Sequence, residues 1–246
     1  MLIQSHSTHI ATPAGTMQTS VYRPLAPGKF PAIIFYSEIF QQTTPITRSA
    51  QIMAGHGFVV LVPEVFHEFN PMGTVLAYDD MGKDKGNADK LAKALEQHDG
   101  DTQAMLEFTL GQSYCNGQVG SMGVCIGGHL AFRAALNPGI AAAFCLYPTD
   151  IHSNTLPCQQ SNDSLTRCGD IQAELTMVFG KQDPHVPATG RVLIQQTMSD
   201  HNLNFTWHEF NAHHAFMRDE GERYDAELAM ECYQMAVRLF NRKLRT

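Results

Sequence analysis

A short glycine-flanked run, Gly-Val-Cys-Ile-Gly at residues 123–127, constrains this chain more than any other feature. A β-prone stretch at residues 117–120 leads into the run, and a helix-prone stretch at residues 129–136 leads out of it. A side chain held on so sharp a turn needs neighbours without Cβ atoms, because the strand and the helix pass close to one another. The order of strand, tight turn and helix predicts a nucleophile elbow, with Cys125 where serine is more usual.

The predicted turn leaves Cys125 at the N-terminus of the following helix. The helix dipole and the free N–H groups at that end favour a thiolate, which is the reactive form of cysteine. The alternative interpretation is a buried cysteine that only packs within a glycine-rich turn.

Composition excludes several classes of protein. The 246 residues carry a formal net charge of −7 without a long charged block. A nucleic-acid binder needs a basic surface to neutralise phosphates, so we expect no nucleic-acid partner. No apolar run approaches the ~20 residues that span a bilayer, and the N-terminus lacks a secretion signal. We therefore expect a cytoplasmic protein with no membrane partner, in which Cys158 and Cys168 stay unpaired.

Predicted strands and helices alternate along the chain, which is typical of a mostly parallel sheet covered by helices. The expected strands are 3–11, 17–23, 30–36, 57–62, 117–120, 140–147, 174–179 and 203–210, and the expected helices are 46–55, 87–110, 129–136, 188–198 and 219–244. The stretch 64–86 has no clean period and is too long for an ordinary connection, so we interpret it as a functional loop. Since the chain has no repeat and no linker, we expect one domain over residues 1–246.

A cysteine nucleophile needs a base, and the base needs a group that orients it. Such groups sit beyond the carboxyl ends of strands in α/β sheets. Asp183 follows the expected strand 174–179, and the pair His213–His214 follows the strand 203–210. Asp183 is therefore the candidate acid, although an aspartate before proline is also typical of a turn. Spacing alone does not choose between the two histidines, and no group of residues forms a convincing metal-ligand set.

With these residues in this order, the chain resembles the dienelactone hydrolase family of α/β-hydrolases. Four motifs carry the resemblance, in order and spacing: Ser-Glu-Ile-Phe at 37–40, Gly-Xaa-Cys-Xaa-Gly-Gly at 123–128, Gly-Xaa-Xaa-Asp-Xaa-Xaa-Val-Pro at 180–187 and Ala-Xaa-His-Ala-Phe at 212–216. Together they cover the chain from about residue 30 to its end. The resemblance implies an α/β-hydrolase fold, with a mostly parallel central sheet and helices on both faces.

The resemblance also implies roles for individual residues. Cys125 matches the family's nucleophile, His214 its base and Asp183 the acid that orients the base. Glu38 matches an additional carboxylate that can accept a hydrogen bond from the resting thiol and hold it away from the histidine. The oxyanion hole would be formed by the backbone N–H groups of Ile39 and Ile126.

Arg218 matches a family arginine that binds a substrate carboxylate, which suits the bidentate geometry of a guanidinium. A second cation would be expected in the loop 64–86. That loop contains no arginine, and only Lys83 and Lys85 are available there. Further residues that we expect to shape the substrate pocket are Tyr78, Asp79, His67 and Tyr147.

These inferences predict a hydrolase that opens small, carboxylate-bearing lactones or cleaves small esters through a thioester acyl-enzyme. The expected partner is a small-molecule substrate, no cofactor is required, and the fold suits a monomer or a weak homodimer. One alternative is a general carboxylesterase or thioesterase for uncharged substrates. The other is a catalytically silent binding protein on the same fold.

Overall fold

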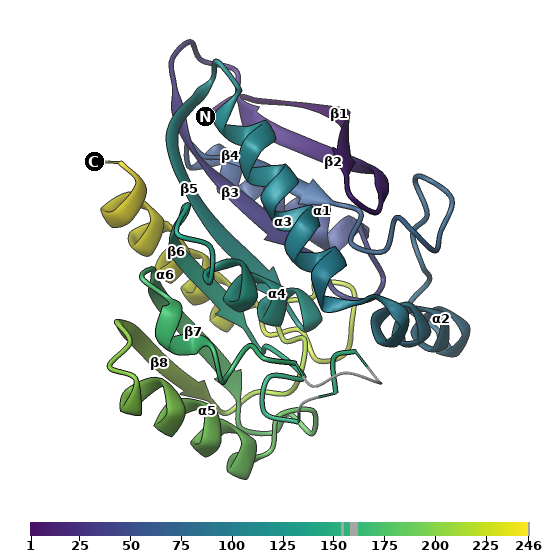
Figure 1. The fold of residues 1–246 in the computed structure, drawn as a ribbon, viewed down its shortest axis with the longest axis vertical. Helices are drawn as coiled ribbons and strands as arrows, with labels where there is room; N and C mark the ends of the chain where they lie inside the picture. The colour runs from purple at the N-terminus through teal and green to yellow at the C-terminus, as the bar shows by residue number, and fades with distance from the viewer. Residues whose placement is uncertain (154, 158–161, 246) are drawn as a thin grey trace.

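The computed structural model describes residues 1–153, 155–157 and 162–245 of the chain. Cys158, whose pairing with Cys168 the sequence raises, lies outside the described residues. The backbone forms one eight-stranded sheet in the order β1-β2-β4-β3-β5-β6-β7-β8, with helices on both sides (Figure 1).

The strands are β1 (Ile3–Thr12), β2 (Gly15–Pro24), β3 (Phe30–Tyr36), β4 (Val59–Pro63), β5 (Cys115–Val124), β6 (Ile140–Leu146), β7 (Glu174–Gly180) and β8 (Phe205–Phe210). The helices are α1 (Thr44–Gly55), α2 (Asp80–Ala92), α3 (Leu95–Leu110), α4 (Ile126–Ala134), α5 (Ala188–Asp200) and α6 (Ala226–Leu244), with a short 3₁₀ turn, η1 (Cys168–Asp170).

Strands β3 to β8 are parallel, whereas β1 and β2 add an antiparallel hairpin at one edge. The carboxyl ends of β3, β5, β7 and β8 therefore open toward the same edge of the sheet. The predicted mostly parallel sheet is confirmed, and its strand ends bring together segments far apart in the sequence.

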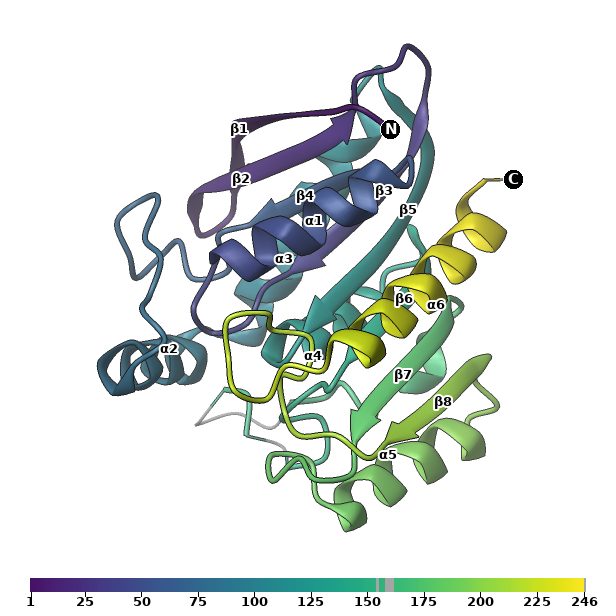
Figure 2. The same cartoon turned by 180° about the vertical axis from the view of Figure 1, so that it is seen from behind.

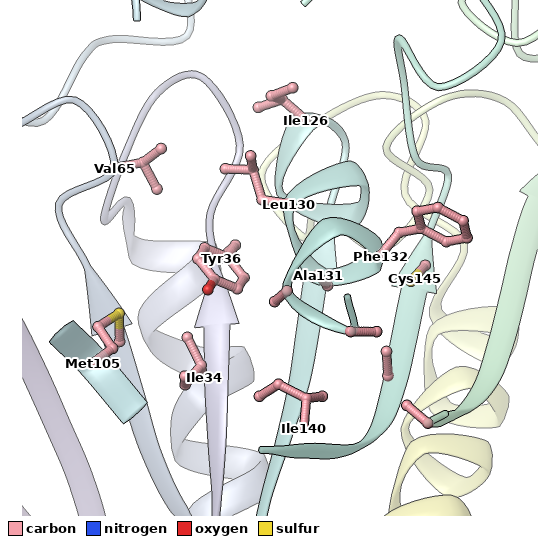
Figure 3. Close-up of a cluster of buried hydrophobic side chains, with 14 of the residues drawn as sticks. Ile34, Tyr36, Val65, Met105, Ile126, Leu130, Ala131, Phe132, Ile140 and Cys145 are labelled. Carbon is pink, nitrogen blue, oxygen red and sulfur yellow. The ribbon is translucent and has the colours of Figure 1, made fainter. Parts of the chain in front are cut away.

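Both faces of the sheet are buried. On β3, Ile34 and Tyr36 belong to one hydrophobic cluster and Ile33 and Phe35 to the other. Figure 3 shows part of the first cluster, where Ile34 and Tyr36 lie near Leu130 of α4. Helices α3, α4 and α5 cover this face (Figure 1), and α1 and α6 cover the opposite face (Figure 2). A strand buried on both faces explains the unbroken apolar run of residues 30–36.

Two predicted helix starts, at residues 87 and 219, are each wrong by seven residues, and caps explain both. The expected loop 64–86 ends early, because Asp79 accepts a 2.7 Å hydrogen bond from the Gly82 amide and starts α2. The expected helix 219–244 begins only at Ala226, where the Asp225 carboxylate accepts a hydrogen bond from the Leu228 amide (3.0 Å). The sequence offered no periodicity at α2, since that helix is polar nearly all round.

Among the described residues, we find no helix that is both long and apolar enough to cross a membrane.

Phe240 anchors α6 to the sheet. It is fully buried, and a Cβ placed on Gly120 of β5 would lie only 2.7 Å from its ring. We expect Phe240→Ala to lower the free energy of unfolding by about 3–5 kcal/mol, because it leaves a cavity between helix and sheet. Chemical denaturation measures this change. Met230→Ala, on the exposed side of the same helix, is the matched control and should change stability by no more than about 0.5 kcal/mol. Equal losses for both variants would contradict the packing described.

Candidate active site

The turn between β5 and α4 carries Cys125 in a strained backbone conformation. Its backbone has φ 59° and ψ −126°, a conformation that few residues other than glycine adopt. A Cβ on Gly123 would lie 1.9 Å from the Gly127 carbonyl oxygen, and one on Gly127 would lie 2.2 Å from the Tyr36 oxygen. The two glycines are therefore required by close backbone approach, and this contact also brings the end of β3 against the turn.

Cys125 is partly exposed and lines a cavity of about 530 Å³. His214 and Glu38 line the same cavity. The size is that of a pocket for a small organic molecule.

Asp183 and His214 meet at this cavity. Asp183 follows β7 and His214 follows β8, and both side chains are buried. Asp183 Oδ2 lies 2.6 Å from His214 Nδ1, while Oδ1 accepts a hydrogen bond from the His185 amide (2.8 Å). His213 is exposed and does not reach Asp183. Of the two histidines that spacing left open, His214 is the one that contacts Asp183.

The electrostatics of this pair favour a protonated imidazole. Burial lowers the pKa of His214, but the charge of Cys125 and hydrogen bonding with Asp183 and Cys125 outweigh it and raise the pKa to about 10. For Asp183, burial raises the pKa, but the hydrogen bond and charge of His214 hold it below its usual value. Asp183 and His214 therefore form a buried carboxylate–imidazolium pair, and the imidazole lines the same cavity as Cys125.

The ring of Tyr147 lies against His214, with ring centroids 5.1 Å apart. Tyr147 is buried, packs against Phe216 on its other side and does not line the cavity that contains Cys125. Tyr147 therefore packs against the imidazole of His214. The sequence interpretation, which placed Tyr147 in the substrate pocket, is wrong on this point.

Glu38 follows β3 and is buried beside Tyr78. The Tyr78 hydroxyl donates to Glu38 Oε1 (2.5 Å), and its oxygen lies 2.7 Å from the Thr43 hydroxyl. Arg218 Nη1 lies 3.8 Å from Glu38 Oε2. Burial raises the pKa of Glu38, although the hydrogen bond from Tyr78 and the charge of Arg218 act against the rise. These are the contacts of Glu38 in the structure, and its predicted hydrogen bond with the Cys125 thiol stays a prediction.

Arg218 lies over the face of the Tyr78 ring, 4.3 Å from its centroid, and lines the cavity. A second arginine that the sequence interpretation missed, Arg223, lines it as well. Arg223 was overlooked because residues 219–225 were assigned to a helix, whereas they form a loop. Arg48 of α1 ties this loop down by hydrogen bonds of 2.6 and 2.8 Å to Asp219 and Glu220.

The remaining predicted pocket residues divide into two groups. Asp79 and Lys83 line the cavity, and Lys83 is bound to Asp80 at 2.7 Å. Lys85 is bound to Asp89 instead and does not line the cavity. His67 lies 3.2 Å from Asp101 and is also outside the cavity lining. The structure therefore does not bring Lys85 and His67 to the candidate site.

His67, Glu68 and Asp101 form a cluster that the sequence analysis did not identify. Their ligand atoms lie within 4.8 Å of one another, a spacing suited to a metal ion. The ammonium of the fully buried Lys93 lies 2.8 Å from Glu68 and 2.5 Å from Asp101. A cation of the chain itself thus balances these carboxylates, so we interpret the cluster as a buried ion-pair network.

The predicted oxyanion-hole residues lie on the two segments that meet at the elbow. Ile126 is the first residue of α4, where backbone N–H groups have no partner within the helix. Ile39 is buried under the cavity and lines it. Their role stays a prediction.

A mostly parallel sheet with a cysteine elbow, and an acid and a histidine beyond later strands, defines an α/β-hydrolase. The model of the dienelactone hydrolase family matches residues 17–244, and the chain belongs to that family. It is accordingly a hydrolase that acts on ester or lactone bonds.

Similar proteins agree with this membership. A Saccharomyces cerevisiae protein provisionally named carboxymethylenebutenolidase is 41% identical over all of this chain and 94% of its own length. The carboxymethylenebutenolidase of Pseudomonas putida is 28% identical over 83% of each chain. A crystal structure from Klebsiella pneumoniae, provisionally named dienelactone hydrolase, superposes with a TM-score of 0.86 at 21% identity, covering 98% of this chain and 99% of that one. The last comparison confirms the fold.

The raised pKa of His214 gives a test of its contact with Cys125. We expect the imidazole to stay protonated through neutral pH and to titrate near pH 10. In Cys125→Ala the pKa of His214 should fall, because the influence of Cys125 that raises it is gone while burial still lowers it. Histidine NMR signals followed against pH measure both values, and His214→Gln assigns the signal. An unchanged pKa in Cys125→Ala would mean that the thiolate does not act on His214.

Proposed function

We propose that the enzyme hydrolyses small esters or lactones through a Cys125–His214–Asp183 triad and a thioester intermediate. The observation that carries the proposal is the 2.6 Å contact between buried Asp183 and His214, whose imidazole lines the same cavity as Cys125. The carboxylate fixes the tautomer and orientation of the imidazole, which leaves Nε2 for the cysteine and the substrate.

In the first half-reaction, the Cys125 thiolate attacks the carbonyl carbon, and the carbonyl π electrons move onto oxygen. The N–H groups of Ile39 and Ile126 stabilise that oxyanion. When the carbonyl reforms, the bond to the alkoxy oxygen breaks and the leaving oxygen takes a proton from His214. In a lactone the leaving oxygen stays attached to the acyl group.

In the second half-reaction, neutral His214 accepts a proton from a water molecule while the water oxygen attacks the thioester carbon. The same oxyanion forms again. Its collapse breaks the carbon–sulfur bond and returns the thiolate, so the free acid is released and His214 is again protonated. No cofactor enters either half-reaction.

One cation of the cavity is available to a substrate with an anionic group. Three of its cations are paired with cavity acids: Arg218 with Glu38, Lys83 with Asp80 and Lys90 with Asp150. Arg223 forms no ion pair with any described residue. A substrate carboxylate can therefore bind Arg223 without breaking an existing pair, and Arg218 lies in the same cavity to share it. We infer that Arg223 supplies the second cation that the sequence analysis sought in residues 64–86.

A carboxylesterase or thioesterase for uncharged substrates is the alternative within enzymes. The carboxylates of Glu38 and Asp150 in the cavity wall support it, since they would repel an anionic group placed beside them.

Replacing the nucleophile tests the mechanism. We expect Cys125→Ala to lower kcat by at least ~10³-fold for a carboxylated dienelactone, because loss of a catalytic nucleophile commonly costs that much or more. Cys232→Ala removes a buried thiol of α6, outside the cavity, and should keep the wild-type rate. Rapid quenching and mass spectrometry should find the acyl group on Cys125 of the wild type. Substantial turnover by Cys125→Ala would overturn the triad.

Removing the unpaired cation tests the substrate class. Two esters serve as a matched pair: p-nitrophenyl hydrogen glutarate carries a carboxylate, and p-nitrophenyl pentanoate does not. We expect Arg223→Gln to raise KM for the charged ester about tenfold or more, since a hydrogen bond to a charged group contributes about 1.5–3 kcal/mol. KM for the neutral ester should not change.

Arg238→Gln makes the same change on the exposed side of α6, outside the cavity, and is the control. An equal effect of Arg223→Gln on the two esters would favour the carboxylesterase for uncharged substrates.

A further inference from the structure

Helix α2 stands apart from the layers that cover the sheet. Figures 1 and 2 both show it projecting at one corner of the fold. Three of its residues are buried: Gly82, Gly86 and Asp89. Two of the three are glycines, so the helix approaches its neighbours with its backbone.

The two glycines contact different parts of the molecule. A Cβ on Gly82 would lie 2.1 Å from the Ala77 oxygen, within the turn that starts α2. A Cβ on Gly86 would lie 2.6 Å from the carbonyl oxygen of Ile39 and 2.9 Å from its Cβ. Real Cβ atoms essentially never come closer than 3.0 Å to such atoms. Gly82 thus allows the close turn at the start of α2, whereas Gly86 packs against Ile39, which lines the cavity.

The segment that contains Ile39 is a tight turn. The Gln41 amide donates to the Glu38 oxygen (3.1 Å), and Gln41 has φ 68°. The residues just before α2 cover the same turn, since the Leu76 amide donates to the Phe40 oxygen (3.1 Å). Gly86 packs against the same turn at Ile39, which lies between Glu38 and Phe40.

At its far end α2 is tied to the wall of the same cavity. Lys90 Nζ lies 3.1 Å from both carboxylate oxygens of Asp150, in the loop after β6. Asp89 is held by a 2.8 Å hydrogen bond from Asn70. These polar contacts hold the second half of α2 in place and so limit how far the Gly86 backbone can move away from Ile39.

From these contacts we infer that Gly86 is a positioning residue for the oxyanion hole. The absence of a side chain lets α2 pack directly on Ile39, and this packing sets where the Ile39 N–H points. The inference rests on the proposed function, in which that N–H binds the oxyanion. Oxyanion stabilisation requires a donor about 2.7–3.1 Å from the developing charge, so a shift of a few tenths of an ångström is felt there.

Gly86→Ala tests the inference by pushing a methyl group against Ile39. We expect kcat for p-nitrophenyl pentanoate to fall about tenfold or more, with KM within about twofold of wild type, since the lost contact belongs to the transition state. The circular dichroism spectrum should be unchanged, because alanine favours helix over glycine.

Alkylation of Cys125 by iodoacetamide separates positioning from general damage to the site. The thiolate sulfur forms a bond to the methylene carbon and iodide leaves with the carbon–iodine electron pair, so no oxyanion develops. We expect the alkylation rate of Gly86→Ala to equal that of the wild type while ester hydrolysis is slowed. Gly55→Ala is the matched control, because a Cβ on Gly55, at the end of α1, meets nothing within 4 Å.

Three results would overturn the inference. Equal losses in alkylation and hydrolysis would mean that Gly86 maintains the cysteine or the fold in general. A higher KM with unchanged kcat would mean that α2 gives way and only reshapes the cavity wall. Failure of Gly86→Ala to fold would assign Gly86 to the core. Loss of the triad itself would be seen separately, as turnover that survives in Cys125→Ala.

Discussion

The structure depends on the close approach of three backbone segments at the turn after β5. Gly123 and Gly127 let the strand, the first turn of α4 and the end of β3 lie within contact distance of one another. The same approach forces Cys125 into a positive φ. Because this strain is fixed between a buried strand and a buried helix, the turn holds Cys125 in a defined backbone conformation, and the segments that bear Ile39 and Ile126 approach it closely.

Burial and neighbouring charges act in opposite directions on the pKa values of Glu38 and Asp183, and the net shift differs between these two groups. Desolvation raises the pKa of Glu38 above its usual value, whereas contact with His214 overcomes it for Asp183. Two carboxyl groups near one histidine therefore differ in their affinity for protons. In the proposed mechanism this difference keeps Asp183 charged, so that it orients the base, and leaves Glu38 able to exchange a proton or a partner as ligands enter.

Much of the fold and the centre of the site could be predicted from sequence because their signals are local. The buried run of β3 and the glycine pattern around Cys125 each lie within ten residues, and Asp183 and His214 follow strands in the expected order. The rest depended on partners distant in sequence. Nothing local shows that Lys85 is taken by Asp89, that Tyr147 lies under His214, or that α2 rests on Ile39 through a glycine.

The loop between β8 and α6 holds His214, the proposed base, near its start, and its later residues hold the groups proposed for substrate recognition. It carries Arg218 and Arg223 but contributes no strand to the sheet, and its outer side is clamped to α1 through Arg48. Residues 219–225, the exposed part of this loop, can be exchanged over evolutionary time without disturbing the close-packed turn at Cys125. Related enzymes can thus change their substrate preference through substitutions in this one surface segment. A substitution of Arg48 on α1 could have the same effect, because Arg48 holds the segment in place.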